Sequence, residues 1–135
     1  MTSVTLDDEY VTDTMALVLH LENRRSSQAV AAIFDSADLG KTTIHIPAMV
    51  LAEILYLAER QRITLDLNDI DKHLKIFPAY RESPMSFEIV QNGLRITDIP
   101  ELHDRLIAST ANHLGLKLIT NDPRIQASKF VDTVW

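Results

Sequence analysis

Two glycines divide this chain into helix–strand units, and they constrain its fold more than any other feature. Gly40 follows the helical pattern SSQAVAAIFDSADL, and Gly115 follows IPELHDRLIASTANHL. Glycine directly after an apolar periodic segment is a common helix stop. Each glycine is followed at once by a short apolar run, TTIHI or LKLIT, with the composition of a strand. Helices that alternate with strands in this way predict an α/β protein with a mostly parallel sheet.

The rest of the chain continues this alternation. The other strand candidates lie at 10–12, near 85–87 and in the closing VDTVW, and the other helix candidates lie at 14–22, 47–62, 68–77 and 88–94. The last of these contains QNG, which also suits a hairpin turn. A chain of 135 residues is enough for one domain. We therefore expect a single α/β domain over 1–135, with about five short strands flanked by helices and with a flexible or poorly ordered tail at 1–8.

Composition excludes several classes of protein. The chain has no cysteine, which removes disulfides, thiolate metal sites and cysteine nucleophiles together. Its formal net charge of −6 argues against binding to nucleic acid through the overall field, so any RNA contact needs a local basic patch. The longest apolar run, IPAMVLAEILYLA, is too short to span a bilayer, and the N-terminus lacks the pattern of a secretory signal. We expect a cytoplasmic protein without a membrane partner.

Two aspartates, Asp13 and Asp122, each follow a strand candidate at the start of a helix candidate. Aspartate is a favoured N-cap residue, and Pro123 suits a first helical turn, so capping alone accounts for both positions. In parallel α/β folds, however, the crevice that binds ligands lies beyond the carboxyl ends of the strands. If the two strands are neighbours, the two carboxylates converge there. The local sequence leaves both interpretations open.

Two further acids lie inside helix candidates. Glu53 is preceded by AMVLA and followed by ILYLA, which predicts a helix packed on most faces. A buried carboxylate there needs a proton, a partner or a cation. The alternative is a narrow solvent-facing stripe with Met49, Tyr56 and Arg60. Asp104 lies beside the apolar face of its own helix, and the alternative for it is a plain surface position. Because like charges hinder one another's ionisation, a shared hard cation such as Mg²⁺ or Mn²⁺ explains why four carboxylates would gather.

The chain resembles the PIN domain family, and within it the small ribonucleases that act as VapC-type toxins of toxin–antitoxin pairs. The resemblance rests on four stretches that occur in order and cover nearly the whole chain: YVTDTMALV, PAMVLAEILYL, ELHDRLIASTANHLGLKLITND and VDTVW. It implies that the catalytic and metal-binding acids are Asp13, Glu53, Asp104 and Asp122. It also implies that the Thr120 hydroxyl helps to orient the site.

The resemblance further implies Mg²⁺- or Mn²⁺-dependent cleavage of RNA phosphodiesters by an activated water, leaving 5′-phosphate and 3′-hydroxyl ends. The implied partners are an RNA substrate, a small protein antitoxin and a second copy in a homodimer. Arg105, beside Asp104, is the candidate phosphate contact. Many members of the family have Asn or Ser where this chain has Met15, and a thioether cannot replace the hydrogen bonds of an amide.

Two other functional classes remain as alternatives. One is a catalytically weak or silent PIN-like module that binds RNA or a partner protein, which Met15 and the acidic net charge favour. The other is a phospho-acceptor signalling domain, which would need a lysine near the end of the last strand, where VDTVW has none. The five histidines show no zinc-type spacing, and we expect none of them to bind a metal.

Overall fold

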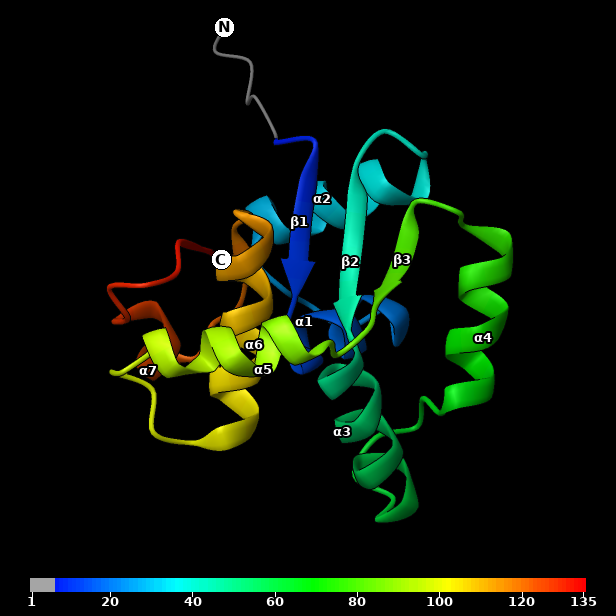
Figure 1. Ribbon diagram of the computed structural model, residues 1–135. Coiled ribbons are helices and arrows are strands. Elements are labelled where there is room, and N and C mark those ends of the chain that lie inside the picture. Colours follow the sequence, from blue (N-terminus) through cyan, green and yellow to red (C-terminus); the bar gives the residue numbers. More distant parts are fainter. Residues whose placement is uncertain (1–6) are drawn as a thin grey trace, which may run out of the picture.

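A five-stranded parallel sheet forms the centre of the computed structural model, which describes residues 7–135 (Figure 1). Its order is β3-β2-β1-β4-β5, so the first strand of the chain lies in the middle. All four neighbouring pairs of strands are parallel, and the carboxyl ends of the strands therefore lie at the same end of the sheet. The strands are β1 (Glu9–Thr12), β2 (Thr43–Pro47), β3 (Tyr80–Ser83), β4 (Leu118–Ile119) and β5 (Thr133–Val134).

Helices connect the strands and flank the sheet. In Figure 1, α3 continues downward from the carboxyl end of β2, and α5 lies against α6. The predicted α/β class with a parallel sheet of about five strands is confirmed. The helices are α1 (Thr14–Leu21), α2 (Gln28–Asp38), α3 (Ala48–Glu59), α4 (Leu67–Ile76), α5 (Phe87–Asn92), α6 (Leu102–Leu114) and α7 (Pro123–Gln126), with a 3₁₀ turn, η1, at Gly93–Arg95.

Two predicted elements near the middle of the chain are wrong. No strand forms at 85–87; the third strand is Tyr80–Ser83 instead. It lies at the edge of the sheet, and its two central residues, Arg81 and Glu82, are exposed, so it lacks the apolar run that identifies a strand in sequence. Residues 87–92 are helical, which excludes a hairpin turn at QNG.

The core lies between the sheet and its helices. Val11, Ile44 and Leu118 are fully buried on three adjacent strands. Because helices cover both faces of the sheet, consecutive residues are buried in β1 and β4, whereas β2 alternates between half-buried and buried positions over 43–46. The helices bury their apolar stripes against the strands through Leu17, Val18, Ile33, Phe34, Val50, Ile54, Ile107, Ala108 and Ala111.

The helix ends follow local sequence closely. Gly115 ends α6 in the left-handed conformation with φ of 68°, and Gly40 follows α2 with φ of 79°, as the glycine stops predict. Of the predicted tail, 1–6 lies outside the described residues, and Asp7 forms a 3.1 Å ion pair with Lys117. Within 7–135, no helix combines the length and hydrophobicity needed to cross a membrane.

Candidate active site

All four predicted acids line a single cavity of about 560 Å³, and each comes from a different element. Asp13 follows β1 and Asp122 follows β4, and these two strands are neighbours in the sheet. Glu53 lies on α3 and Asp104 on α6. The parallel topology thus brings together side chains from opposite ends of the chain. The other lining residues are Thr14, Met15, Ile107, Asn121, Pro123, Arg124 and Ile125.

Asp13 is both a helix cap and a wall of the cavity. Its Oδ1 accepts a 2.8 Å hydrogen bond from the Ala16 amide, which caps α1. Burial raises the pKa of the Asp13 carboxyl to about 6, although hydrogen bonds from Thr120 and Ala16 lower it; repulsion from Asp122 and Asp104 adds to the rise. Both interpretations of this aspartate are therefore compatible with its position.

Glu53 lies at the boundary between the cavity and solvent. The Thr14 hydroxyl donates a 3.0 Å hydrogen bond to its Oε1. Burial raises the pKa of the Glu53 carboxyl; the Thr14 bond opposes the rise, and the Asp104 carboxylate adds to it. The prediction that α3 is packed on most faces is wrong, since Val50 and Ile54 are the buried residues of this helix.

The other two acids differ in how their charge is balanced. Burial raises the pKa of the Asp104 carboxyl, and repulsion from Glu101 and Asp122 raises it further. Asp122 accepts a 2.9 Å hydrogen bond from the Arg124 amide and thereby caps α7. The Arg124 Nε atom is also 3.7 Å from Asp122 Oδ1. In the described part of the chain, this is the only ion pair between one of the four acids and a Lys or Arg side chain.

Thr120 connects the two strand-end aspartates. It is fully buried, and its Oγ1 accepts a 3.1 Å hydrogen bond from the Asp122 amide. The same side chain lowers the pKa of the Asp13 carboxyl, so it lies beside that group as well. This hydroxyl is therefore near both strand-end aspartates.

Arg105 does not face the cavity. Its Nε donates a 2.7 Å hydrogen bond to the Ile99 carbonyl, and its Nη2 donates to the Pro100 carbonyl at 3.3 Å, so the guanidinium fixes the segment before α6. The cationic side chain that lines the cavity is Arg124. The sequence did contain a signal for it, because Arg124 directly follows the Asp122-Pro123 helix start.

The donor set of the cavity suits a hard divalent cation. The four acids offer only carboxylate oxygens, the ligand type that Mg²⁺ and Mn²⁺ prefer. Among residues 7–135, no three of these four acids place an oxygen each within 4.8 Å of one another, as expected for like charges that repel. Such spacing still fits Mg²⁺, which keeps several waters in its shell and needs few direct carboxylate ligands.

Comparison with known proteins agrees with this fold. Similar folds occur in VapBC2 from Rickettsia felis bound to promoter DNA (TM-score 0.71, 19% identity, 93% of this chain and 97% of that chain) and in FitAcB from Neisseria gonorrhoeae (0.63, 21%, 93% and 96%). VapC20 from Mycobacterium tuberculosis, a sarcin–ricin loop cleaving toxin, is also similar (0.63, 12%, 91% and 97%). No curated protein matches the sequence. The family model of the PIN domain matches residues 10–131, and the chain therefore belongs to the PIN domain family.

Proposed function

We propose that this protein is a metal-dependent endoribonuclease and the toxin of a type II toxin–antitoxin pair. The observation that carries the proposal is the cavity in which Asp13, Glu53, Asp104 and Asp122 meet from four separate elements. The similar folds support the biological class, because a toxin–antitoxin complex from Klebsiella pneumoniae is among them and VapC20 is a sarcin–ricin loop cleaving toxin. The partners we propose are an RNA substrate, a small antitoxin and a second copy of the chain.

The residues of the cavity have separable tasks in this proposal. A bound Mg²⁺ or Mn²⁺ makes a water more acidic and offsets negative charge on a phosphoryl oxygen. The four carboxylates would hold the cation, some of them through its bound waters, with Thr120 orienting Asp13 and Thr14 orienting Glu53. Arg124 contacts the phosphate in place of Arg105, because its side chain is the cationic one that lines the cavity.

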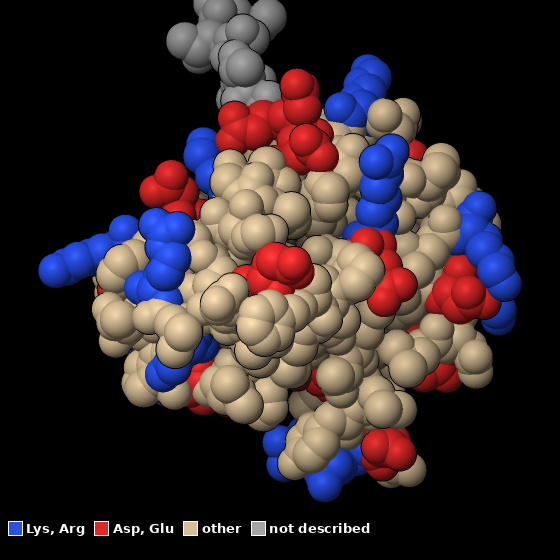
Figure 2. Space-filling view, in the orientation of Figure 1, with Lys and Arg blue, Asp and Glu red and all other residues tan. Residues whose placement is uncertain are grey.

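RNA binding must then depend on contacts near the cavity. The net charge is −6, and Figure 2 shows the Lys and Arg side chains of one face as separate groups without a continuous basic band. A protein of this charge gains little from long-range attraction to RNA.

Phe87 and Leu94 are 76% and 78% exposed, and with Val90 they provide apolar surface for a protein partner.

Asparagine variants of the two capping aspartates test the proposal. Asp13→Asn and Asp122→Asn keep a good N-cap but remove a charged metal ligand. We expect each to reduce Mn²⁺-dependent RNA cleavage by about 100-fold or more while retaining the fold. Asp71→Asn is the matched control, because Asp71 is exposed on α4 and pairs only with Lys75. Equal cleavage by all four proteins, with contaminating nuclease excluded, would refute the assignment.

A silent RNA- or protein-binding module is the second candidate. Met15 favours it, because its thioether lines the cavity where an amide or hydroxyl would orient the site. In that case the wild-type protein binds RNA or its protein partner, shows no cleavage with Mg²⁺ or Mn²⁺, and gives the same result for both asparagine variants.

A further inference from the structure

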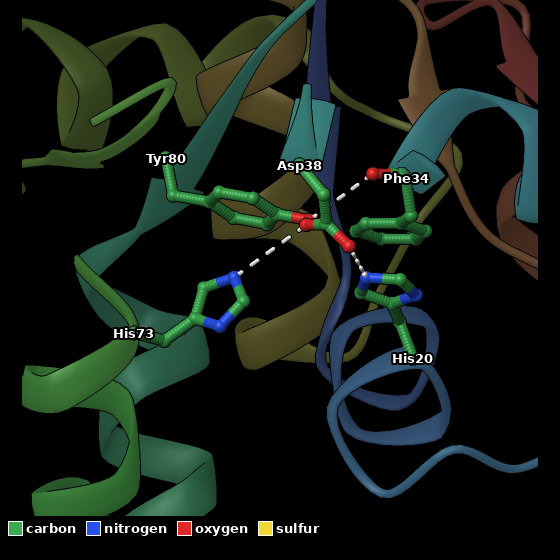
Figure 3. Close-up of polar contacts among 5 residues, drawn as sticks. All are labelled: His20, Phe34, Asp38, His73 and Tyr80. Atoms are coloured by element: carbon green, nitrogen blue, oxygen red, sulfur yellow. Dashed lines mark hydrogen bonds and ion pairs between the residues drawn. The ribbon is translucent and has the colours of Figure 1, made fainter. Parts of the chain in front are cut away.

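A second group of titratable side chains lies where α1, α2, α4 and β3 meet, and it shares no residue with the cavity of the four acids (Figure 3). His20 lies in the last turn of α1, and Asp35 and Asp38 lie near the end of α2. Each of the three offers one ligand atom, and these atoms are all within 4.8 Å of one another. In the described residues, no other group of three His, Asp or Glu side chains has this arrangement.

The two inner members of this group are held in fixed orientations. The Tyr80 hydroxyl donates a 2.6 Å hydrogen bond to Asp38 Oδ1, and Asp38 Oδ2 lies 2.9 Å from His20 Nε2. The imidazole of His20 is stacked on the Phe34 ring, with centroids 4.7 Å apart. Figure 3 shows the Asp38 carboxylate between His20 and Tyr80. Hydrogen bonds and packing of this kind orient the imidazole and carboxylate ligands of metal ions.

The two aspartates of the group lack cationic partners, and the neighbouring His73 lacks a hydrogen bond. Across 7–135, neither Asp35 nor Asp38 forms an ion pair with Lys or Arg; Asp38 pairs only with His20 and His73. His73 Nε2 is 3.8 Å from Asp38 Oδ1, which is too far for a hydrogen bond. Of the buried side-chain nitrogens and oxygens in this range, it alone has no hydrogen-bond partner. Because folded proteins satisfy nearly all such atoms, the protein's own groups do not complete this network.

The group is also open to solvent on one side. A cavity of about 450 Å³ is lined by His20 and Asp35, so an ion can reach these two side chains from solvent with room for bound water. Arg24 and Arg25 also line this cavity. The charge of Arg24 is offset, because its Nη1 donates a 3.2 Å hydrogen bond to Glu22 Oε1.

We propose that His20, Asp35 and Asp38 bind a divalent transition-metal ion of the zinc class. One imidazole nitrogen, two carboxylate oxygens and a water make up a tetrahedral zinc shell. An imidazole ligand favours Zn²⁺ over Mg²⁺, whereas the cavity of the four acids offers oxygen ligands alone. The ion ties the end of α1 to the end of α2. The expectation that no histidine binds a metal is replaced by this proposal, since the three ligands are close in space while their spacing in sequence matches no zinc motif.

Zn²⁺ titration followed by calorimetry tests the proposal. The Asp13→Asn/Asp122→Asn double variant serves as the parent, so that binding in the four-acid cavity is suppressed. We expect one Zn²⁺ per chain that millimolar Mg²⁺ does not displace. His20→Gln and Asp35→Asn should each weaken binding at least about tenfold. His113→Gln is the control for loss of a histidine, because His113 is exposed on α6.

Asp35→Asn keeps the test valid if His20→Gln unfolds the protein. The Asp35 side chain is exposed and forms no hydrogen bond or ion pair within 7–135, so its change leaves the fold intact. No uptake of Zn²⁺ by the parent, or wild-type affinity in Asp35→Asn, overturns the proposal. The readout is binding rather than RNA cleavage, so this result is independent of the proposed nuclease function.

Discussion

At the scale of single residues, one carboxylate can serve a helix and a site at the same time. Asp13 caps α1 through the Ala16 amide and also faces the cavity of the four acids. The cap is local and can be predicted from sequence, because it depends on the Asp-Thr-Met-Ala stretch alone. The elevated pKa depends mainly on burial of the carboxyl and, to a lesser extent, on repulsion from Asp122 and Asp104, and only the tertiary fold supplies these.

The elevated pKa of Asp13 predicts a pH-dependent stability of the metal-free protein. The folded carboxyl has a pKa of about 6, against 3.8 for the ordinary group, so it binds its proton more tightly in the folded state. Ionising this carboxyl therefore lowers the stability of the folded protein. The loss is absent below pH 3.8, grows as pH rises to 6, and is fully present above pH 6. Its upper limit is about 3 kcal/mol. Asp13→Asn should therefore raise the melting temperature in EDTA, and by more at pH 7.5 than at pH 4.5.

Thermal melts in EDTA at both pH values measure this effect. Asp71→Asn is again the control and should show no pH-dependent gain. A melting temperature of Asp13→Asn that is lower than wild type at pH 7.5 would show that the charged carboxylate stabilises the fold, contrary to this account.

At the scale of elements, a single carboxylate fastens the connection between α3 and α4 to the end of α1. Glu22 Oε2 accepts hydrogen bonds from the Thr64 amide and hydroxyl, both at 2.7 Å, and from the Leu65 amide at 2.9 Å. Desolvation acts to raise the pKa of Glu22, but these bonds and Arg24 outweigh it and lower the value to about 2. The contact positions the start of α4, which carries His73.

Glu22→Gln should have a pH dependence opposite to that of Asp13→Asn. Because the pKa of the Glu22 carboxyl is lower in the folded than in the unfolded protein, its negative charge stabilises the fold. This stabilisation is fully present above pH 4.5 and is lost as pH falls toward 2. The variant should therefore be destabilised by about 1–3 kcal/mol at pH 7, and by less at pH 3. Urea unfolding at the two pH values measures the difference. An equal loss at pH 3 and pH 7 would show that the charge of Glu22 is not what fastens the loop.

The elements differ in how far the sequence predicts them. Helix ends at Gly40 and Gly115 are predictable, because the left-handed backbone needed there is a local property of glycine. The edge strand at 80–83 is not, because its exposed positions carry no apolar signal. The Glu22–Thr64 contact joins residues 42 positions apart, and no local pattern indicates it. For the same reason, the sequence suggested Arg105 as the phosphate contact, whereas in the folded chain the Arg105 side chain bonds to the Ile99 carbonyl and Arg124 lines the cavity.

At the scale of the whole molecule, the last strand supports the site without contributing a side chain to it. The Leu118 amide donates to the Asp132 carbonyl at 2.9 Å, and the Thr120 amide donates to the Val134 carbonyl at 3.1 Å. These bonds hold β4, from which Thr120 and Asp122 extend into the cavity region. The geometry of two site residues thus depends on the final strand, β5.

Ending the chain at Val131 should therefore affect both stability and the site. The amides of Leu118 and Thr120 lose their acceptors, and the melting temperature should fall by about 5 °C or more. The stabilisation by millimolar Mn²⁺ should shrink as well, because Asp122 is no longer held in place. Asp132→Ala is the control, since it keeps the backbone carbonyl and changes only an exposed side chain. Unchanged melting of the truncated chain would show that β4 is stable without its neighbour.

The central position of β1 also has a consequence for the order of events during synthesis. Synthesis makes β1 long before its neighbour β4 and the Asp122 loop, which follow at 118–122. A nascent chain therefore lacks one wall of the four-acid cavity until residue 122 has been added and has folded against β1. If the protein is a ribonuclease as proposed, the site is incomplete for most of its own synthesis. Over that period the growing polypeptide is harmless to the messenger and ribosomal RNA beside it, and an antitoxin has no complete site to inhibit.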